Sequence, residues 1–263
     1  MTDPLIDRLG SMDTDVRNEA IAEAAEATGD DVALALVALV TSGDVGTPAR
    51  TAASQALARM PDGVGADRLR EILQHETPEF RGLAASGLEF HPSPATVSAL
   101  LSALEDPVNK VRNVAERSLL AMTCVFDDDA HEQIARLLDH PVPLTRSPAA
   151  RLVGAASIES LAERLSEMAV ADDEWLPRVW SSRALGELGD TPGLDVVEVL
   201  ERVATTDDKN RVRAAAVEAI GELRAARSDE ILRAVLEADD DEGVCRAAEE
   251  ALEDLQRGGF ADE

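Results

Sequence analysis

Apolar residues recur along the chain with the spacing of one face of a helix. In the segment VRAAAVEAIGEL, residues 212–223, Val212, Ala216 and Ile220 fall on one stripe, and Arg213 stands one residue inside it. The same pattern, with arginine at the same place, occurs seven times at intervals of 31 to 35 residues. We call these residues the ladder arginines: Arg17, Arg50, Arg81, Arg112, Arg146, Arg178 and Arg213. An eighth copy carries Cys245 at this position. A repeat of this length predicts an array of stacked units.

A second, shorter apolar pattern precedes the arginine-bearing segments. It is clearest in residues 30–40, 64–73, 94–104, 129–138, 158–169, 193–204 and 229–238. Asp, Thr and Pro between the two patterns are typical helix starts, and no segment alternates with the period of a strand. The sequence therefore predicts an all-α fold, an α-solenoid or superhelix of about eight helix pairs. In residues 140–156, three prolines predict that the second helix begins late.

The repeats divide the whole chain, residues 1–263, into one predicted solenoid with a short acidic tail at 258–263. The expected repeats are 1–29, 30–62, 63–91, 92–124, 125–156, 157–190, 191–226 and 227–257.

The segments ALEDPVNKVRNVAERSLLA (103–121) and VATTDDKNRVRAAAVEAIGEL (203–223) resemble the HEAT-repeat family, in its short variety found in phycobilisome-lyase-like proteins. The resemblance covers essentially the whole chain. It implies that turn aspartates and ladder arginines pair within and between repeats, so that the ladder is structural. An arginine fork is well suited to carboxylates and exposed carbonyls.

The acidic composition of the chain is better explained by a salty environment than by a binding partner. Aromatic residues make up 2% of the chain, there is no tyrosine, and the formal net charge is −27. Lys110 and Lys209 are the only lysines. An acidic surface with so little lysine resembles proteins of halophilic, salt-accumulating archaea, where molar salt screens the repulsion between carboxylates.

Cys124 and Cys245 lie in distant repeats, so we expect free thiols and a reducing, cytoplasmic location. The N-terminal residues lack the pattern of a signal peptide, and no apolar run is long enough to span a membrane.

The sequence offers little for catalysis or for a cofactor. Deoxyhypusine hydroxylase is a HEAT-like enzyme that binds iron through four His-Glu pairs, but here only His75–Glu76 and His131–Glu132 occur, outside the arginine-bearing helices. Zinc spacing, a phosphate-binding loop and a nucleophile elbow are missing. The acidic runs at 127–130 and 239–242 read as solvated helix starts. We therefore expect no metal and no cofactor.

We expect a non-enzymatic scaffold or adaptor that binds another protein along the concave face of the solenoid, because one helix of each pair lines that surface. Two alternatives stay open. The first is a phycobilin-lyase-like enzyme or accessory protein. The second is a nucleic-acid-binding protein, which the acidity disfavours.

Two columns of the second helices place the expected partner site. Five residues after the ladder arginine, repeats four to six carry Arg117, Arg151 and Arg183. Two residues after it, repeats three to six carry Leu83, Val114, Pro148 and Trp180. Tryptophan and arginine are enriched in interface hot spots. In one hypothesis, these residues form a concave site that binds an acidic, partly apolar segment of another protein. The other packs Trp180 into the next repeat and pairs the arginines with neighbouring acids.

Overall fold

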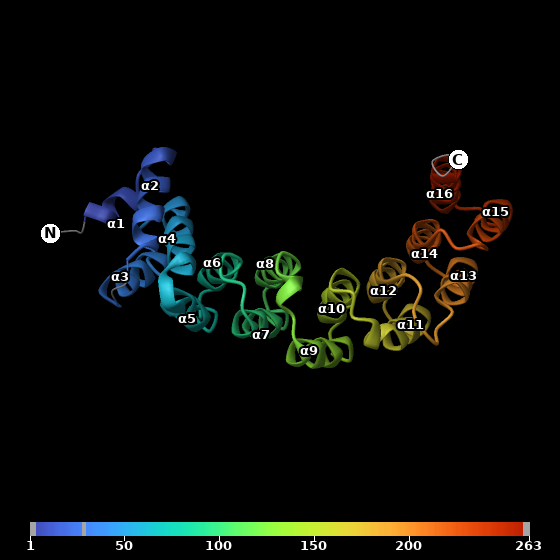
Figure 1. Cartoon of the computed structure of the whole chain (residues 1–263), viewed down its shortest axis with the longest axis horizontal. Coiled ribbons are helices and arrows are strands. Elements are labelled where there is room, and N and C mark those ends of the chain that lie inside the picture. Colours follow the sequence, from blue (N-terminus) through green and yellow to red (C-terminus); the bar gives the residue numbers. More distant parts are fainter. Residues whose placement is uncertain (1–3, 28–29, 260–263) are drawn as a thin grey trace. The chain divides into compact units, whose positions relative to one another are not determined.

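The computed structural model describes residues 4–27 and 30–259, and this part of the chain forms sixteen α-helices and no strand (Figure 1). The odd-numbered helices, here called A helices, are α1 (Pro4–Leu9), α3 (Asp30–Val40), α5 (Val64–Ile72), α7 (Pro94–Ala103), α9 (Asp128–Leu138), α11 (Ala162–Ala171), α13 (Val196–Thr206) and α15 (Ser228–Ala238). The even-numbered B helices carry the ladder: α2 (Thr14–Ala25), α4 (Thr47–Arg59), α6 (Pro78–Leu88), α8 (Asn109–Leu120), α10 (Pro143–Ala155), α12 (Trp175–Leu188), α14 (Asn210–Leu223) and α16 (Glu242–Gly259). The predicted fold class is confirmed.

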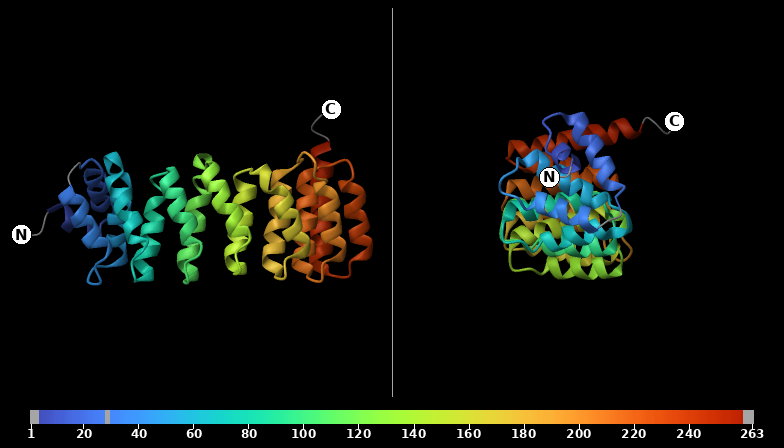
Figure 2. Two further views of the ribbon diagram at one scale, coloured as in Figure 1. Left: turned by 90° about the horizontal axis from the view of Figure 1, so that it is seen from below. Right: turned by 90° about the vertical axis from the view of Figure 1, so that its left-hand side faces the viewer.

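The chain divides into two compact units, Met1–Ala130 and His131–Glu263, with the division inside α9. Within each unit the B helices form one row and the A helices form another (Figures 1 and 2). Helix α16 continues into the predicted tail as far as Gly259. Residues 260–263 of that tail, and residues 28–29 at the end of the first predicted repeat, lie outside the described residues.

The B helices share one register, because the ladder residue is the fourth residue of every one of them. The prediction of a late start in the fifth repeat is wrong. Helix α10 begins at Pro143, three residues before Arg146, and Pro148 lies inside the helix without ending it. Proline suits the first turn because its missing N–H would have had no partner there, so Pro143 favours the early start.

Small residues let successive B helices of the second unit approach closely. Gly154, Gly186 and Gly221 stand eight residues after the ladder position of their helices. A Cβ atom added at Gly186 would lie 2.7 Å from Ala219 Cβ, and one added at Gly221 would lie 2.7 Å from Ala251 Cβ. These contacts leave no space for a larger side chain, and leucines of both helix rows fill the rest of the core.

Gly186→Ala should therefore destabilise the protein by about 1–3 kcal/mol, since the added methyl group overpacks the contact with α14. Gly82→Ala is the matched control, because Gly82 also lies inside a B helix and an added Cβ meets nothing within 4 Å. Alanine should stabilise that helix by about 0.5–1 kcal/mol. Denaturant unfolding compares the two variants. Equal effects of the two substitutions would contradict the close packing described for α12 and α14.

Candidate functional site

Each ladder arginine is anchored first to its own repeat. Six of them donate Nη1–H to the backbone carbonyl of a residue six positions earlier, at N···O distances of 2.6–3.0 Å: Arg17, Arg81, Arg112, Arg146, Arg178 and Arg213. Arg50 instead donates to the carbonyl of Ser42, eight positions earlier. Cys245 keeps the pattern, because its thiol donates to the carbonyl of Asp239 with an S···O distance of 3.1 Å. This bond fixes the turn between the A and B helices.

Four ladder arginines also grip an aspartate of the following helix pair. In each case Nε and Nη2 donate to the two carboxylate oxygens at 2.6–3.0 Å: Arg81 to Asp106, Arg146 to Asp172, Arg178 to Asp207 and Arg213 to Asp239. These side chains are only 7–18% exposed. Because the carbonyl of the same aspartate accepts the next arginine, the second unit holds an unbroken series of bonds from Arg146 to Cys245.

Two ladder aspartates, Asp106 and Asp239, are stabilised as anions. Burial works to raise the pKa of Asp106, but hydrogen bonds from Arg81 and from the Val108 N–H outweigh it, so the pKa falls below its ordinary value. The hydrogen bond from Arg213 lowers the pKa of Asp239. A lowered folded-state pKa means that each of these two pairs contributes its full stability at pH values above the unfolded-state pKa of the aspartate. That contribution is lost as the pH falls through the folded-state value.

Histidine replaces aspartate at two steps of the ladder. His75 Nδ1 accepts from the Thr77 N–H at 3.0 Å, and His140 Nδ1 accepts from the Val142 N–H at 3.1 Å. Asp106 Oδ1 accepts from the Val108 N–H in the same way at 2.8 Å. A neutral imidazole that accepts at Nδ1 carries its proton on Nε2, so that edge offers no acceptor to an arginine. Accordingly, the buried Nε atoms of the preceding ladder arginines have no hydrogen-bond partner within the described chain: Arg50 and Arg112.

His75→Asp should therefore stabilise the first unit by about 1 kcal/mol, because a carboxylate supplies the acceptor that Arg50 Nε lacks. His91→Asp serves as the control, since His91 lies in the turn before α7 and outside the ladder. Urea unfolding measures both. A loss of stability in His75→Asp, or an equal gain in His91→Asp, would show that the ladder position does not prefer a carboxylate.

The structure brings together three of the residues predicted for the partner site. In the second unit, the guanidinium carbons of Arg151 and Arg183 lie 4.9 Å and 5.3 Å from the ring centroid of Trp180. All three side chains are partly exposed, and Arg183 Nη2 donates to Glu218 Oε2 at 2.8 Å. We call Arg151, Trp180 and Arg183 the Trp180 patch. It combines features of both hypotheses, because Trp180 stays partly exposed while Arg183 pairs with a neighbouring acid.

The other predicted residues belong to the first unit. Leu83 on α6 and Val114 on α8 are partly exposed. Arg117 is exposed, and its Nη2 donates to Ser86 Oγ at 3.3 Å.

Sequence reasoning missed a further column on the same helix face. Position nine after the ladder continues the spacing of positions two and five, with steps of three and four residues. In the first unit it holds Phe90, 38% exposed, whose ring centroid lies 4.2 Å from the guanidinium carbon of Arg59. In the second unit it holds the acids Glu187, Glu222 and Asp254. Burial and the nearby Glu222 charge raise the pKa of Glu187, although Arg151 and Arg183 act in the opposite direction.

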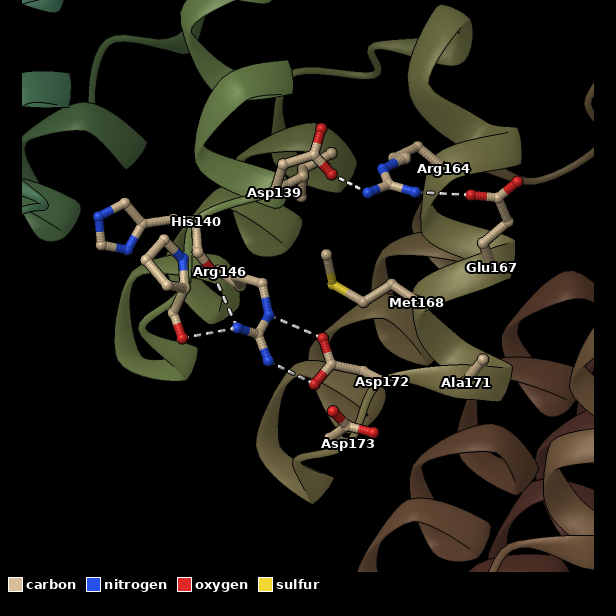
Figure 3. A pocket seen from close by; sticks show the side chains of 11 residues that line it. Asp139, His140, Arg146, Arg164, Glu167, Met168, Ala171, Asp172 and Asp173 are labelled. Atoms are coloured by element: carbon tan, nitrogen blue, oxygen red, sulfur yellow. Dashed lines mark hydrogen bonds and ion pairs between the residues drawn. The ribbon is translucent and has the colours of Figure 1, made fainter.

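A groove of about 560 Å³ lies in the second unit beside the turn between α9 and α10 (Figure 3). Arg146 and Asp172 form one wall as a ladder pair, and Arg164 pairs with Asp139 and Glu167 on the other. The first unit has an equivalent groove of about 430 Å³ beside His75, Arg81 and Asp106. Because the groove recurs at the same step of the repeat, we interpret it as a consequence of the ladder geometry.

Within residues 4–27 and 30–259, no three His, Cys, Asp or Glu side chains are arranged to hold a metal ion. His75 lies in the turn after α5 and His131 in α9, so neither His-Glu pair lies on a B helix. None of the described helices is long and apolar enough to cross a membrane.

Comparison with protein families decides the relationship of the chain. The model described as HEAT repeats matches residues 47–120 and 158–253, more than half of the sequence. The chain belongs to the HEAT-repeat family. Three of the four ladder pairs lie wholly within the matched residues. Of the fourth pair, Asp172 lies within them and Arg146 lies outside. No curated protein matches the sequence significantly.

Solved structures share this HEAT fold at low sequence identity. A chain from the complex of Kap95p with RanGDP has a TM-score of 0.64 at 14% identity, and a chain from the Kap95:Nup1 complex has 0.62 at 14%. Each alignment covers 96% of this chain and 40% of the other. A chain from the CpcE–CpcF phycocyanin lyase complex of Nostoc sp. PCC7120 has a TM-score of 0.52 at 18% identity, covering 60% of this chain and 98% of that one. These similarities establish the fold alone.

Proposed function

We propose that this HEAT-repeat protein is a non-enzymatic scaffold that binds another protein on the face formed by its B helices. The Trp180 patch is the proposed centre of the site in the second unit, and Leu83, Val114 and Arg117 are the proposed contact residues in the first. The observation that carries the proposal is a partly exposed tryptophan whose ring is contacted by two guanidinium groups.

The geometry of the patch favours binding because its side chains are already ordered. Stacking against Arg151 and Arg183 restrains the ring of Trp180, and the bond to Glu218 restrains Arg183. A partner that covers this ring therefore loses less conformational entropy than one that must order free side chains. Large aromatic and arginine side chains also contribute most of the energy in many protein interfaces.

The position of the patch supports the same function. In the second unit the B helices α10, α12, α14 and α16 pack closely in one row, whereas the A helices contact one another much less. Closer spacing on one side makes the B row the inner side of that unit. Chains from a phycocyanin lyase complex and from two Kap95 complexes share the fold, so the fold alone does not distinguish between functions. The proposal therefore depends on the surface at the Trp180 patch. We propose an acidic, partly apolar segment as the occupant of the Trp180 patch.

Substitution of Trp180 and Arg151 tests the proposal. Tagged protein carrying Trp180→Ala and Arg151→Glu should retain at least about tenfold less partner protein from a native high-salt lysate, as expected for loss of two hot-spot residues. The control carries Leu236→Ala and Arg233→Glu, which make the same types of change on the A helix α15. Circular dichroism establishes folding, and Arg151→Glu alone is used if the double variant unfolds. Wild-type retention by a folded variant would place the site elsewhere.

A further inference from the structure

Successive B helices in the middle of the second unit fill the space between them with the chain's own cationic side chains. Arg151 from α10 lies over Trp180 of α12, and Arg183 from α12 reaches Glu218 of α14. Arg151 and Arg183 stand five residues after their ladder arginines, and Trp180 stands two residues after its own. We call the space between two successive B helices a step. One guanidinium group thus lies in the step between α10 and α12, and another lies in the step between α12 and α14.

The next step, between α14 and α16, has neither arginine nor tryptophan at the equivalent positions. The position that holds Arg183 in α12 holds Glu218 in α14 and Glu250 in α16, and alanine, including Ala247, replaces tryptophan. The result is a groove of about 370 Å³, which we call the acidic groove. Its lining is Glu218, Gly221, Glu222, Arg224, Ala247, Glu250, Ala251 and Asp254.

The acidic groove joins an apolar floor to carboxylate walls. Gly221 is in close contact with Ala251, so the floor has little relief. Three of the carboxylates already have basic partners: Glu218 pairs with Arg183, Glu250 Oε1 lies 4.0 Å from Arg246 Nε, and Asp254 pairs with Arg257 at 2.7 Å. Glu222 makes no hydrogen bond or ion pair within the described residues.

Acidic residues outnumber basic ones in the lining of the groove. Arg224 is the only basic residue among the eight, against the carboxylates of Glu218, Glu222, Glu250 and Asp254. Next to the groove, on α12, burial and the charge of Glu222 raise the pKa of Glu187, although Arg151 and Arg183 act in the opposite direction. A cation bound in the groove would meet Glu222, a carboxylate without a partner among the described residues.

We propose that the acidic groove binds an arginine side chain of the partner protein. This inference rests on the proposed function, because it places the arginine on the same segment that contacts the Trp180 patch. The aliphatic stem would cover the floor at Gly221, Ala247 and Ala251, while the planar guanidinium meets the carboxylates with its fork of donors. The second unit itself shows this arrangement one step earlier, where Arg183 meets Glu218.

Helix spacing sets the place of this arginine in the partner. The acidic groove lies two helix steps from the space between α10 and α12. Two steps of 8–10 Å make roughly 16–20 Å. An extended chain covers that distance in about five or six residues. The partner segment should therefore carry an arginine about five or six residues from the acidic, apolar part that covers Trp180.

Hexa-arginine labelled with fluorescein is the probe, titrated into the full-length protein at the lowest salt concentration that keeps it folded. Fluorescence anisotropy gives the Kd. Glu222→Gln with Glu250→Gln should weaken binding at least about tenfold. The control, Glu230→Gln with Glu237→Gln, makes the same change in net charge with two exposed residues of α15 and should weaken binding less than about twofold. Equal weakening by the two double variants, or no binding to the wild type, would overturn the inference.

A second variant closes the groove without changing its charge. Ala247→Trp places in α16 the residue that α12 carries at the same position, and it should weaken hexa-arginine binding about as much as the loss of the carboxylates. Unchanged binding to this variant would overturn the inference. Trp180→Ala with Arg151→Glu should leave hexa-arginine binding at least as tight as in the wild type. If hexa-arginine fails to bind while partner retention still depends on Trp180, this inference fails and the proposed function stands.

Discussion

Replacing Asp172 with alanine is expected to lower the free energy of unfolding by about 3 kcal/mol, because it leaves a buried arginine without its carboxylate. The Arg146 and Asp172 side chains are 14% and 7% exposed, and two hydrogen bonds join them across consecutive helix pairs. The substitution keeps the backbone carbonyl of residue 172, so the bond from Arg178 is preserved. The loss therefore measures the pair between repeats together with the bond that Asp172 Oδ1 accepts from the Glu174 N–H at 2.9 Å.

The matched control is Asp229→Ala in α15. Arg233 grips Asp229 with the same two donors at 2.8 Å and 3.1 Å, but both side chains are more than half exposed and belong to one helix. Exposed pairs of this kind contribute about 0.3–0.5 kcal/mol. Urea-induced unfolding at constant salt compares the variants. Equal destabilisation by the two substitutions would contradict a structural role for the ladder.

Salt should change the stability of this protein by several kcal/mol. Its 52 acidic residues face 25 basic ones, and the Debye length falls from about 30 Å at 0.01 M salt to about 3 Å at 1 M. Repulsion among exposed carboxylates should therefore weaken the fold in dilute buffer. The buried ladder pairs are screened much less, so the effect should come from the surface.

The expected result is a melting temperature at least about 10 °C higher in molar sodium chloride than in dilute buffer, with a larger helical circular dichroism signal. Sucrose provides the control, because it stabilises folded proteins by exclusion from their surface without screening charge. A melting temperature that responds equally to sucrose and to salt, or to neither, would contradict the proposal that the acidity is an adaptation to molar salt.

The repeated sequence predicted the helix order because one apolar stripe recurs in all eight copies and one arginine recurs at the same place in seven of them. The start of α10 was predicted wrongly, because three prolines were given more weight than the position of Arg146. The helix register follows the arginine, whose bond to the carbonyl of His140 fixes the turn in front of the helix.

The site could be predicted only in part. Positions two and five placed Trp180, Arg151 and Arg183 on one face, but stacking between neighbouring helices depends on side-chain reach that a sequence column does not contain. Position nine was overlooked, although helical spacing indicates it, and with it Phe90 and Glu222 were missed. The division of the structure at residue 130 has no counterpart in the repeat pattern, which runs through α9 without interruption.

Site-specific crosslinking tests whether the B-helix face of the second unit binds a protein. A photoreactive benzoyl-phenylalanine replaces Trp180 in one protein and Arg233, on the A helix α15, in another, and both are irradiated in native high-salt lysate. We expect a discrete protein adduct from position 180 that excess unlabelled wild-type protein abolishes, and no such adduct from position 233. A competed adduct from position 233 with none from position 180 would contradict binding at this face.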